Sequence, residues 1–167
     1  MKMKNSKSGF TLIEMITVLA IIILIASLVM AAGQAARRKA YEAKAKAAIA
    51  SLEVALGMYQ VDVGSYPADN GAPYTSNSTL VTQLDSGGGT PPTGWSGPYM
   101  QFDSKDLSGS NFIDPWSHNY YYKNPGLNHG TGMNHTSYVD IYSAGQNGSY
   151  QSSGAGQPPQ GDDIANW

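Results

Sequence analysis

The hydrophobic and polar positions divide the first part of the chain into three stretches. Residues 1–9 are basic, and an almost uninterrupted apolar run follows at 10–32. As a helix, this run would span about 30 Å of hydrocarbon. From residue 33 to 60 the apolar positions recur every three or four residues, as they do along one helix face. We therefore predict one long helix, whose first half is transmembrane and whose second half is amphipathic with a stripe of Tyr41, Ala45, Ala48, Ile49, Leu52, Leu56 and Tyr59.

The remaining residues, 61–167, have the pattern of a small globular head. A short helix is predicted at 78–84, and a Gly- and Pro-rich loop at 87–99. Two extended aromatic stretches lie at 119–123 and 138–145, and the second alternates as a strand does. Together they predict an antiparallel hairpin or meander. The predicted fold class is α+β, with the end of the long helix packed on a small antiparallel sheet.

Composition and charge exclude several classes of function. A formal net charge of −2 gives no argument for nucleic-acid binding, and the absence of cysteine excludes disulfides and thiolate chemistry. The glycines at 87–89 have no predicted strand before them and no helix after them, so they do not make a phosphate loop. His118, His129 and His135 lack the spacing of a zinc site and are interpreted as surface residues. We find no catalytic constellation and predict that the chain is not an enzyme.

Glu14 is the unusual residue of the apolar run. A carboxylate at this depth costs a few kcal/mol unless it is paired. It could reach back to the nearby membrane interface, or it could pair with a positive group from another subunit in an assembly. A cleaved secretory signal is the alternative for the whole run, but its apolar part would be only about 7–15 residues long.

The N-terminal sequence GFTLIEMITVLAIIILIASL resembles the signature of type IV pilins and type II secretion pseudopilins. The resemblance implies that a prepilin peptidase cuts between Gly9 and Phe10 and methylates Phe10. It also implies that Glu14 aids assembly by matching the terminal amine of a neighbouring subunit. The chain then has a basic leader (1–9) that is removed before assembly.

Further matches lie in the head. YPADNG, GPYM, DPWSHNYYYKNPG, YVDIYSAGQNG and DDIANW resemble the major pseudopilins of type II secretion systems. The resemblance implies a pilin-like subunit that polymerises into a periplasmic pseudopilus, with minor pseudopilins and an inner-membrane assembly platform as partners. It places the chain in the bacterial inner membrane as a single-pass protein with a periplasmic head, an orientation that the flanking lysines and arginines do not decide by themselves. The alternative is the major subunit of a type IV pilus, serving adhesion, motility or DNA uptake.

The C-terminal segment carries a candidate calcium site. A Gly-, Ser- and Gln-rich stretch precedes the ending DDIANW, whose Ile and Trp suggest that the end docks back on the head. Calcium prefers carboxylate, amide and carbonyl oxygens. The resemblance implies that calcium is held by backbone carbonyls of Ala144 and Ser149, the side-chain oxygen of Asn147, and the carboxylates of Asp162 and Asp163. Asn147 stands where the family usually has Asp, which removes one negative charge and should weaken binding or shift the work to Asp162 and Asp163.

Overall fold

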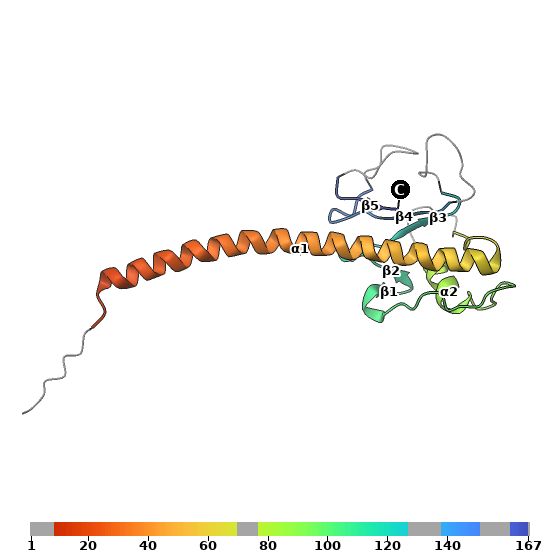
Figure 1. Cartoon of the computed structure of the whole chain (residues 1–167), viewed down its shortest axis with the longest axis horizontal. Coiled ribbons are helices and arrows are strands. Elements are labelled where there is room, and N and C mark those ends of the chain that lie inside the picture. Colours follow the sequence, from red (N-terminus) through yellow and green to blue (C-terminus); the bar gives the residue numbers. More distant parts are fainter. Residues whose placement is uncertain (1–8, 70–76, 127–137, 151–160, 167) are drawn as a thin grey trace, which may run out of the picture. The chain divides into compact units, whose positions relative to one another are not determined.

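The computed structural model describes residues 9–69, 77–126, 138–150 and 161–166 (Figure 1). The chain separates into two compact units, Met1–Ala40 and Tyr41–Trp167. We call the first the N-terminal unit and the second the head unit. His129 and His135, which the sequence analysis interprets as surface residues, lie outside the described residues, and so does Trp167.

The predicted long helix is present as α1, Leu12–Val63, and contributes to both units. It begins two residues after the start of the predicted apolar run and ends four residues after Tyr59. Alanine-rich sequence without an interior proline favours this continuity. Within the N-terminal unit its large apolar side chains are exposed. Within the head unit the predicted stripe forms part of the core, except for Tyr41, which is 45% exposed.

The second helix of the head unit, α2 (Ser78–Ser86), confirms the predicted short helix and is two residues longer. Asn77 precedes it but makes no side-chain cap. Its buried side chain instead crosses to β2 and to the residue before β3. Nδ2 donates to the carbonyls of Phe112 (2.8 Å) and Tyr120 (2.6 Å), and Oδ1 accepts from Phe112 N (2.7 Å). Asn77 thus satisfies three backbone groups inside the core.

A two-stranded hairpin joins β1 (Leu107–Ser108) and β2 (Asn111–Phe112) after the short 3-10 helix η1 (Ser104–Asp106). The sequence analysis did not predict this hairpin. Each strand has only two residues, too few to show an alternating pattern.

The main sheet has three antiparallel strands in the order β3–β4–β5 (Figure 1). Strands β3 (Tyr121–Lys123) and β4 (Asp140–Ser143) confirm the two predicted aromatic strands and their antiparallel pairing. The third strand, β5 (Ile164–Ala165), pairs with β4 and brings the C-terminal segment onto the sheet. The fold is the predicted α+β, pilin-like arrangement of a long N-terminal helix followed by small antiparallel sheets.

Candidate functional sites

Glu14 lies in the first turn of α1, where it forms a reciprocal pair with Thr11. Thr11 N and Thr11 Oγ1 donate to Glu14 Oε2 at 2.8 and 2.7 Å, and Glu14 N donates to Thr11 Oγ1 at 3.3 Å. This is a capping box, which satisfies backbone N–H groups that the first helical turn leaves without partners. Sequence reasoning missed it, although the Thr-x-x-Glu spacing of residues 11–14 was a usable signal.

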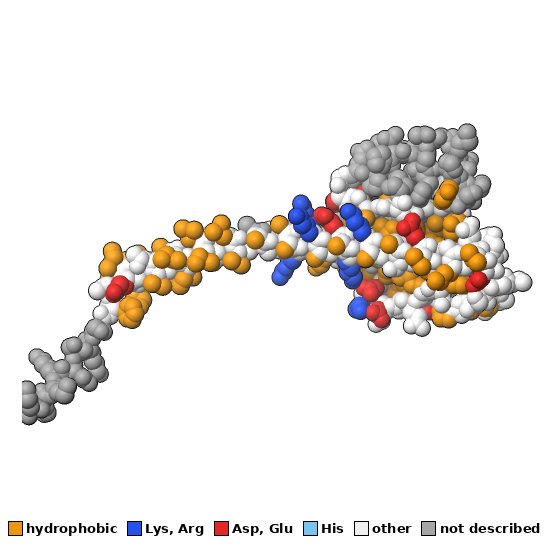
Figure 2. All heavy atoms as spheres, viewed as in Figure 1, with side chains coloured by type: hydrophobic (Ala, Val, Ile, Leu, Met, Phe, Trp, Pro, Cys, Tyr) orange, Lys and Arg blue, Asp and Glu red, His pale blue; other side chains and the backbone are white. Residues whose placement is uncertain are grey.

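The first half of α1 presents apolar side chains on every side. An 18-residue window of α1 has mean hydropathy 2.9 and none of it is buried, so the helix is long and apolar enough to cross a membrane. Figure 2 shows hydrophobic side chains along this part of the helix and basic ones farther along. Exposed apolar surface on this scale marks a membrane or protein contact. The large exposed side chains of this half of α1 include Leu12, Ile13, Ile16, Leu19, Ile22, Leu24, Ile25, Leu28 and Met30.

Gly9 and Phe10 precede α1 and have no helical or strand structure. Phe10 is 78% exposed, and a side chain built on Gly9 would meet nothing within 4 Å. The predicted scissile bond therefore lies in an open segment of the chain.

Residues 161–166, which we call the closing segment, meet the loop after β4 through Asn147 and Asp162. Asn147 N donates to Asp162 Oδ2 at 2.8 Å, and Asn147 Nδ2 donates to Asp162 Oδ1 at 2.6 Å. Asn147 Oδ1 accepts from Ser149 N at 2.7 Å. We call residues 144–149 the closing loop. The closing segment is also fixed by Asn166, whose side-chain oxygen accepts from Ile141 N at 2.9 Å.

The other side of the closing loop is held by His118, Ser143 and Asp114. His118 Nδ1 donates to Gly145 O at 3.0 Å, and Gly145 N donates to Ser143 Oγ at 3.1 Å. Ser143 Oγ donates in turn to Asp114 Oδ2 at 2.5 Å, and the Asp114 side chain is fully buried. The sequence analysis interpreted His118 as a surface residue, whereas the structure gives it a place in this network.

The predicted calcium ligands are only partly brought together. Asn147 and Asp162 are in contact, Ala144 is buried, and one carboxylate oxygen of Asp163 is buried. A cation between Asn147 and Asp162 would need oxygens on both sides. Asn147 offers its NH2 group there instead, and Ser149 contributes its N–H to the loop. Asn147 as arranged here does not fit the predicted ligand role, and calcium binding stays a prediction.

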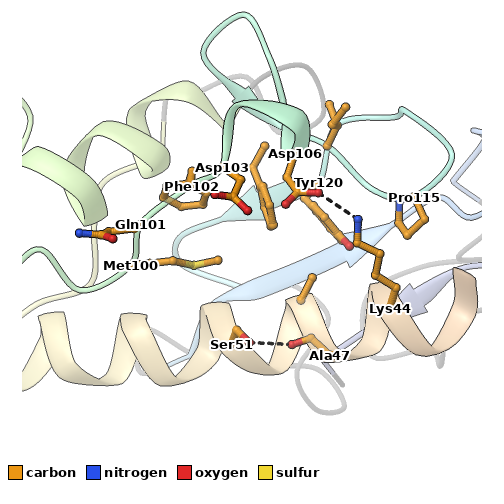
Figure 3. A pocket seen from close by; sticks show the side chains of 13 residues that line it. Lys44, Ala47, Ser51, Met100, Gln101, Phe102, Asp103, Asp106, Pro115 and Tyr120 are labelled. Carbon is orange, nitrogen blue, oxygen red and sulfur yellow. Dashed lines mark hydrogen bonds and ion pairs between the residues drawn. The ribbon is translucent and has the colours of Figure 1, made fainter.

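A groove of about 450 Å³ opens in the head unit between α1 and residues 100–106 (Figure 3). Lys44 Nζ and Asp106 Oδ1 form an ion pair at 2.9 Å at its edge, and Asp103 pairs with Lys105. Tyr120 also lines the groove, and burial raises the pKa of its phenol well above the ordinary value, with smaller contributions from the nearby carboxylates of Asp114 and Asp106. The charged groups of the groove are thus paired with one another. The Tyr120 phenol, whose pKa is raised by burial, is held neutral, and this is not the arrangement of a catalytic acid or base.

Comparisons with known proteins decide which family this architecture represents. A family profile described as type II secretion system (T2SS), protein G, matches residues 33–167. The chain belongs to this family. A second profile, the prokaryotic N-terminal methylation motif, matches residues 4–31 and therefore includes Gly9, Phe10 and Glu14. As a type II secretion pseudopilin, the chain is a structural subunit of the pseudopilus and not an enzyme.

Among solved structures, the chain is similar to the major pseudopilin from the type 2 secretion system of enterohaemorrhagic Escherichia coli. The sequence identity is 24% and the TM-score 0.46, with 80% of this chain and 92% of that chain covered. No curated protein sequence matches the chain.

Proposed function

We propose that this pseudopilin polymerises with copies of itself into a helical filament in the periplasm. Before assembly it is a single-pass protein of the bacterial inner membrane, with its head in the periplasm. The observation that carries the proposal is the first half of α1, whose apolar window is entirely exposed within the chain. Lipid covers such a surface in the membrane, and the corresponding helices of other copies cover it in a filament.

Processing comes first in this proposal. A prepilin peptidase cuts between Gly9 and Phe10 and methylates the new N-terminus. The match of residues 4–31 to the methylation motif supports this step, as does the open backbone at the two residues. Removing the leader places an amine at Phe10, one residue before the capping box at Thr11.

Glu14 then pairs with the Phe10 amine of a neighbouring copy. Both hydrogen bonds from Thr11 go to Glu14 Oε2, so Oε1 is the oxygen that we expect to meet the amine. A carboxylate and an amine each cost free energy in an apolar surrounding, and pairing lowers both costs. The capping box holds the carboxylate in place for this contact.

Minor pseudopilins and an inner-membrane assembly platform complete the set of partners in this proposal. Membership of the protein G family supports assembly into a pseudopilus. No role in nucleic-acid binding is proposed, because the net charge of −2 gives no electrostatic basis for one.

The charge of Glu14 can be tested separately from its capping role. Glutamine also completes a capping box, so Glu14→Gln keeps the helix end and removes only the charge. Glu14→Ala removes both, and Thr11→Val removes the Thr11 hydroxyl while keeping the carboxylate. Expressed with the secretion machinery, all three variants should insert and be cleaved, which mass spectrometry of the N-terminus measures.

Filament yield after shearing and electron microscopy then separates the roles. We expect Glu14→Gln and Glu14→Ala to abolish filaments and Thr11→Val to reduce them. Normal filaments from Glu14→Gln would show that the charge is not needed and would overturn the pairing.

A further inference from the structure

The closing loop lies between Asp162 on one side and His118 on the other. Gly145 has φ +62°, and a Cβ placed on it would overlap the backbone of Asp162. Gly148 has φ +67°, and a Cβ there would lie 2.8 Å from His118 Nε2. Only glycine tolerates both the backbone conformation and the closeness at these positions. The loop therefore has a defined path, set by its neighbours on either side.

Asn147 faces Asp162 with two donors. The backbone N–H and the side-chain NH2 each reach one carboxylate oxygen, at 2.8 and 2.6 Å. Hydrogen bonds to an ionised acceptor are shorter and stronger than those between neutral groups. The pair of bonds closes the gap between the loop and the C-terminal segment, which are 15 residues apart in the chain.

The orientation of the Asn147 amide follows from its other partner. Ser149 N–H is a donor, so the atom facing it at 2.7 Å must be the amide oxygen. Turning the amide over would set two donors against each other at Ser149 and two oxygens against each other at Asp162. An aspartate at this position would place an oxygen against Asp162, and the two carboxylates would need a cation between them.

The opposite side of the loop is held by His118, Ser143 and Asp114. There His118 donates to the Gly145 carbonyl, and Ser143 accepts from the Gly145 N–H while it donates to buried Asp114. Protein hydrogen bonds thus hold the loop on both sides.

We propose that the closing loop of this pseudopilin is held by the Asn147–Asp162 hydrogen bonds without bound calcium, and that Asn147 is the residue that removes the need for the cation. The amide supplies donors where calcium binding needs an oxygen. The proposal concerns the stability of the head and does not depend on how the filament is assembled.

The test compares the full-length wild type with Asn147→Asp, both purified in detergent. Thermal unfolding is followed by near-ultraviolet circular dichroism in EGTA and in calcium up to about 10 mM, which exceeds the dissociation constants of weak protein calcium sites. Wild type should have the same Tm in both. Asn147→Asp should lose roughly 2–8 °C in EGTA through repulsion from Asp162, and calcium should restore it.

Gln146→Glu is the matched control. It adds the same negative charge to a neighbouring exposed position of the loop, and it should show neither the loss nor the recovery. Isothermal titration of calcium into the wild type gives a reading that does not depend on any variant folding.

Calcium uptake by the wild type, with a higher Tm than in EGTA, would overturn the proposal. So would an Asn147→Asp variant whose Tm does not respond to calcium. No heat of binding in the wild type, together with a calcium-dependent Asn147→Asp, is the expected result.

Discussion

The two halves of α1 belong to one continuous helix, but their apolar side chains are exposed in the first half and form a buried face in the second. In the N-terminal unit Leu19 and Leu24 are 58% and 64% exposed, whereas in the head unit Leu52 and Leu56 are fully buried. A helix is stabilised in a folded protein mainly by packing of its apolar face. The head half has that packing within its own chain, and in the proposed function the first half obtains it from lipid or from other copies.

Polar groups differ between the two units in the same way. The capping box of Thr11 and Glu14 is exposed within its own chain, and its bonds join residues only three positions apart in the first turn of α1. Asn77 and Asp114 are buried in the head, where a lost partner leaves an unsatisfied group. The head is therefore sensitive to single substitutions, and the first half of α1 becomes sensitive only on assembly.

The largest expected effect comes from one substitution made in both halves of the helix. Leu56→Ala leaves a cavity in the head core and should lower the free energy of unfolding by about 2–5 kcal/mol. Leu24→Ala, the same change at an exposed position, should alter it by less than about 0.5 kcal/mol. Denaturant unfolding of the full-length protein in detergent, followed by the fluorescence of Trp95 and Trp116, measures both values.

Equal losses from Leu56→Ala and Leu24→Ala would contradict the comparison, because they would mean that the first half of α1 contributes to the stability of the head. Leu24→Ala should nevertheless lower the yield of filaments, although it leaves the stability of the head almost unchanged.

Much of the fold could be predicted from the sequence because its signals are long or regular. The apolar stripe of α1 repeats over several turns, and β3 and β4 lie in extended stretches rich in tyrosine, although β4 is buried along its whole length and does not alternate. The hairpin β1–β2 has two residues per strand and no such signal. The C-terminal segment was expected to dock, and β5 shows how, by pairing with β4.

The residues of the candidate sites were harder to predict where their role depends on distant partners. An Asn before a short helix suggests an N-cap, yet the Asn77 side chain turns away to residues 35 and 43 positions later. His118 has a donor role that depends on Gly145, 27 residues away. The capping box of Thr11 and Glu14, by contrast, has a local sequence signal, the Thr-x-x-Glu spacing, which lies at the start of the apolar run.

A smaller effect is expected from removing a polar side chain in each unit. Asn77→Ala deprives three buried backbone groups of their partner and should cost the head about 1–3 kcal/mol. Thr11→Ala removes an exposed cap, worth about 1 kcal/mol to the end of α1, and should leave unfolding of the head unchanged. Hydrogen exchange by mass spectrometry separates the two, since Thr11→Ala should raise exchange only in the first turn. A loss of head stability from Thr11→Ala would show that the two units are energetically coupled.

The smallest expected effect is a change in how the stability of the head depends on pH when Tyr122 is replaced. Its hydroxyl donates to Pro67 O at 2.7 Å inside the head, and burial raises its pKa above the ordinary value of 10.0, with a further contribution from the Asp69 carboxylate. A raised pKa in the folded state means that the stabilisation is complete below pH 10 and is lost as the pH rises above it. Tyr122→Phe should cost about 1 kcal/mol at neutral pH. Above pH 10 it should make the fall of stability with pH shallower, by up to about 1.4 kcal/mol per pH unit. Denaturant unfolding at a series of alkaline pH values gives the slope, and parallel slopes for the two proteins would show that Tyr122 releases its proton without unfolding the head.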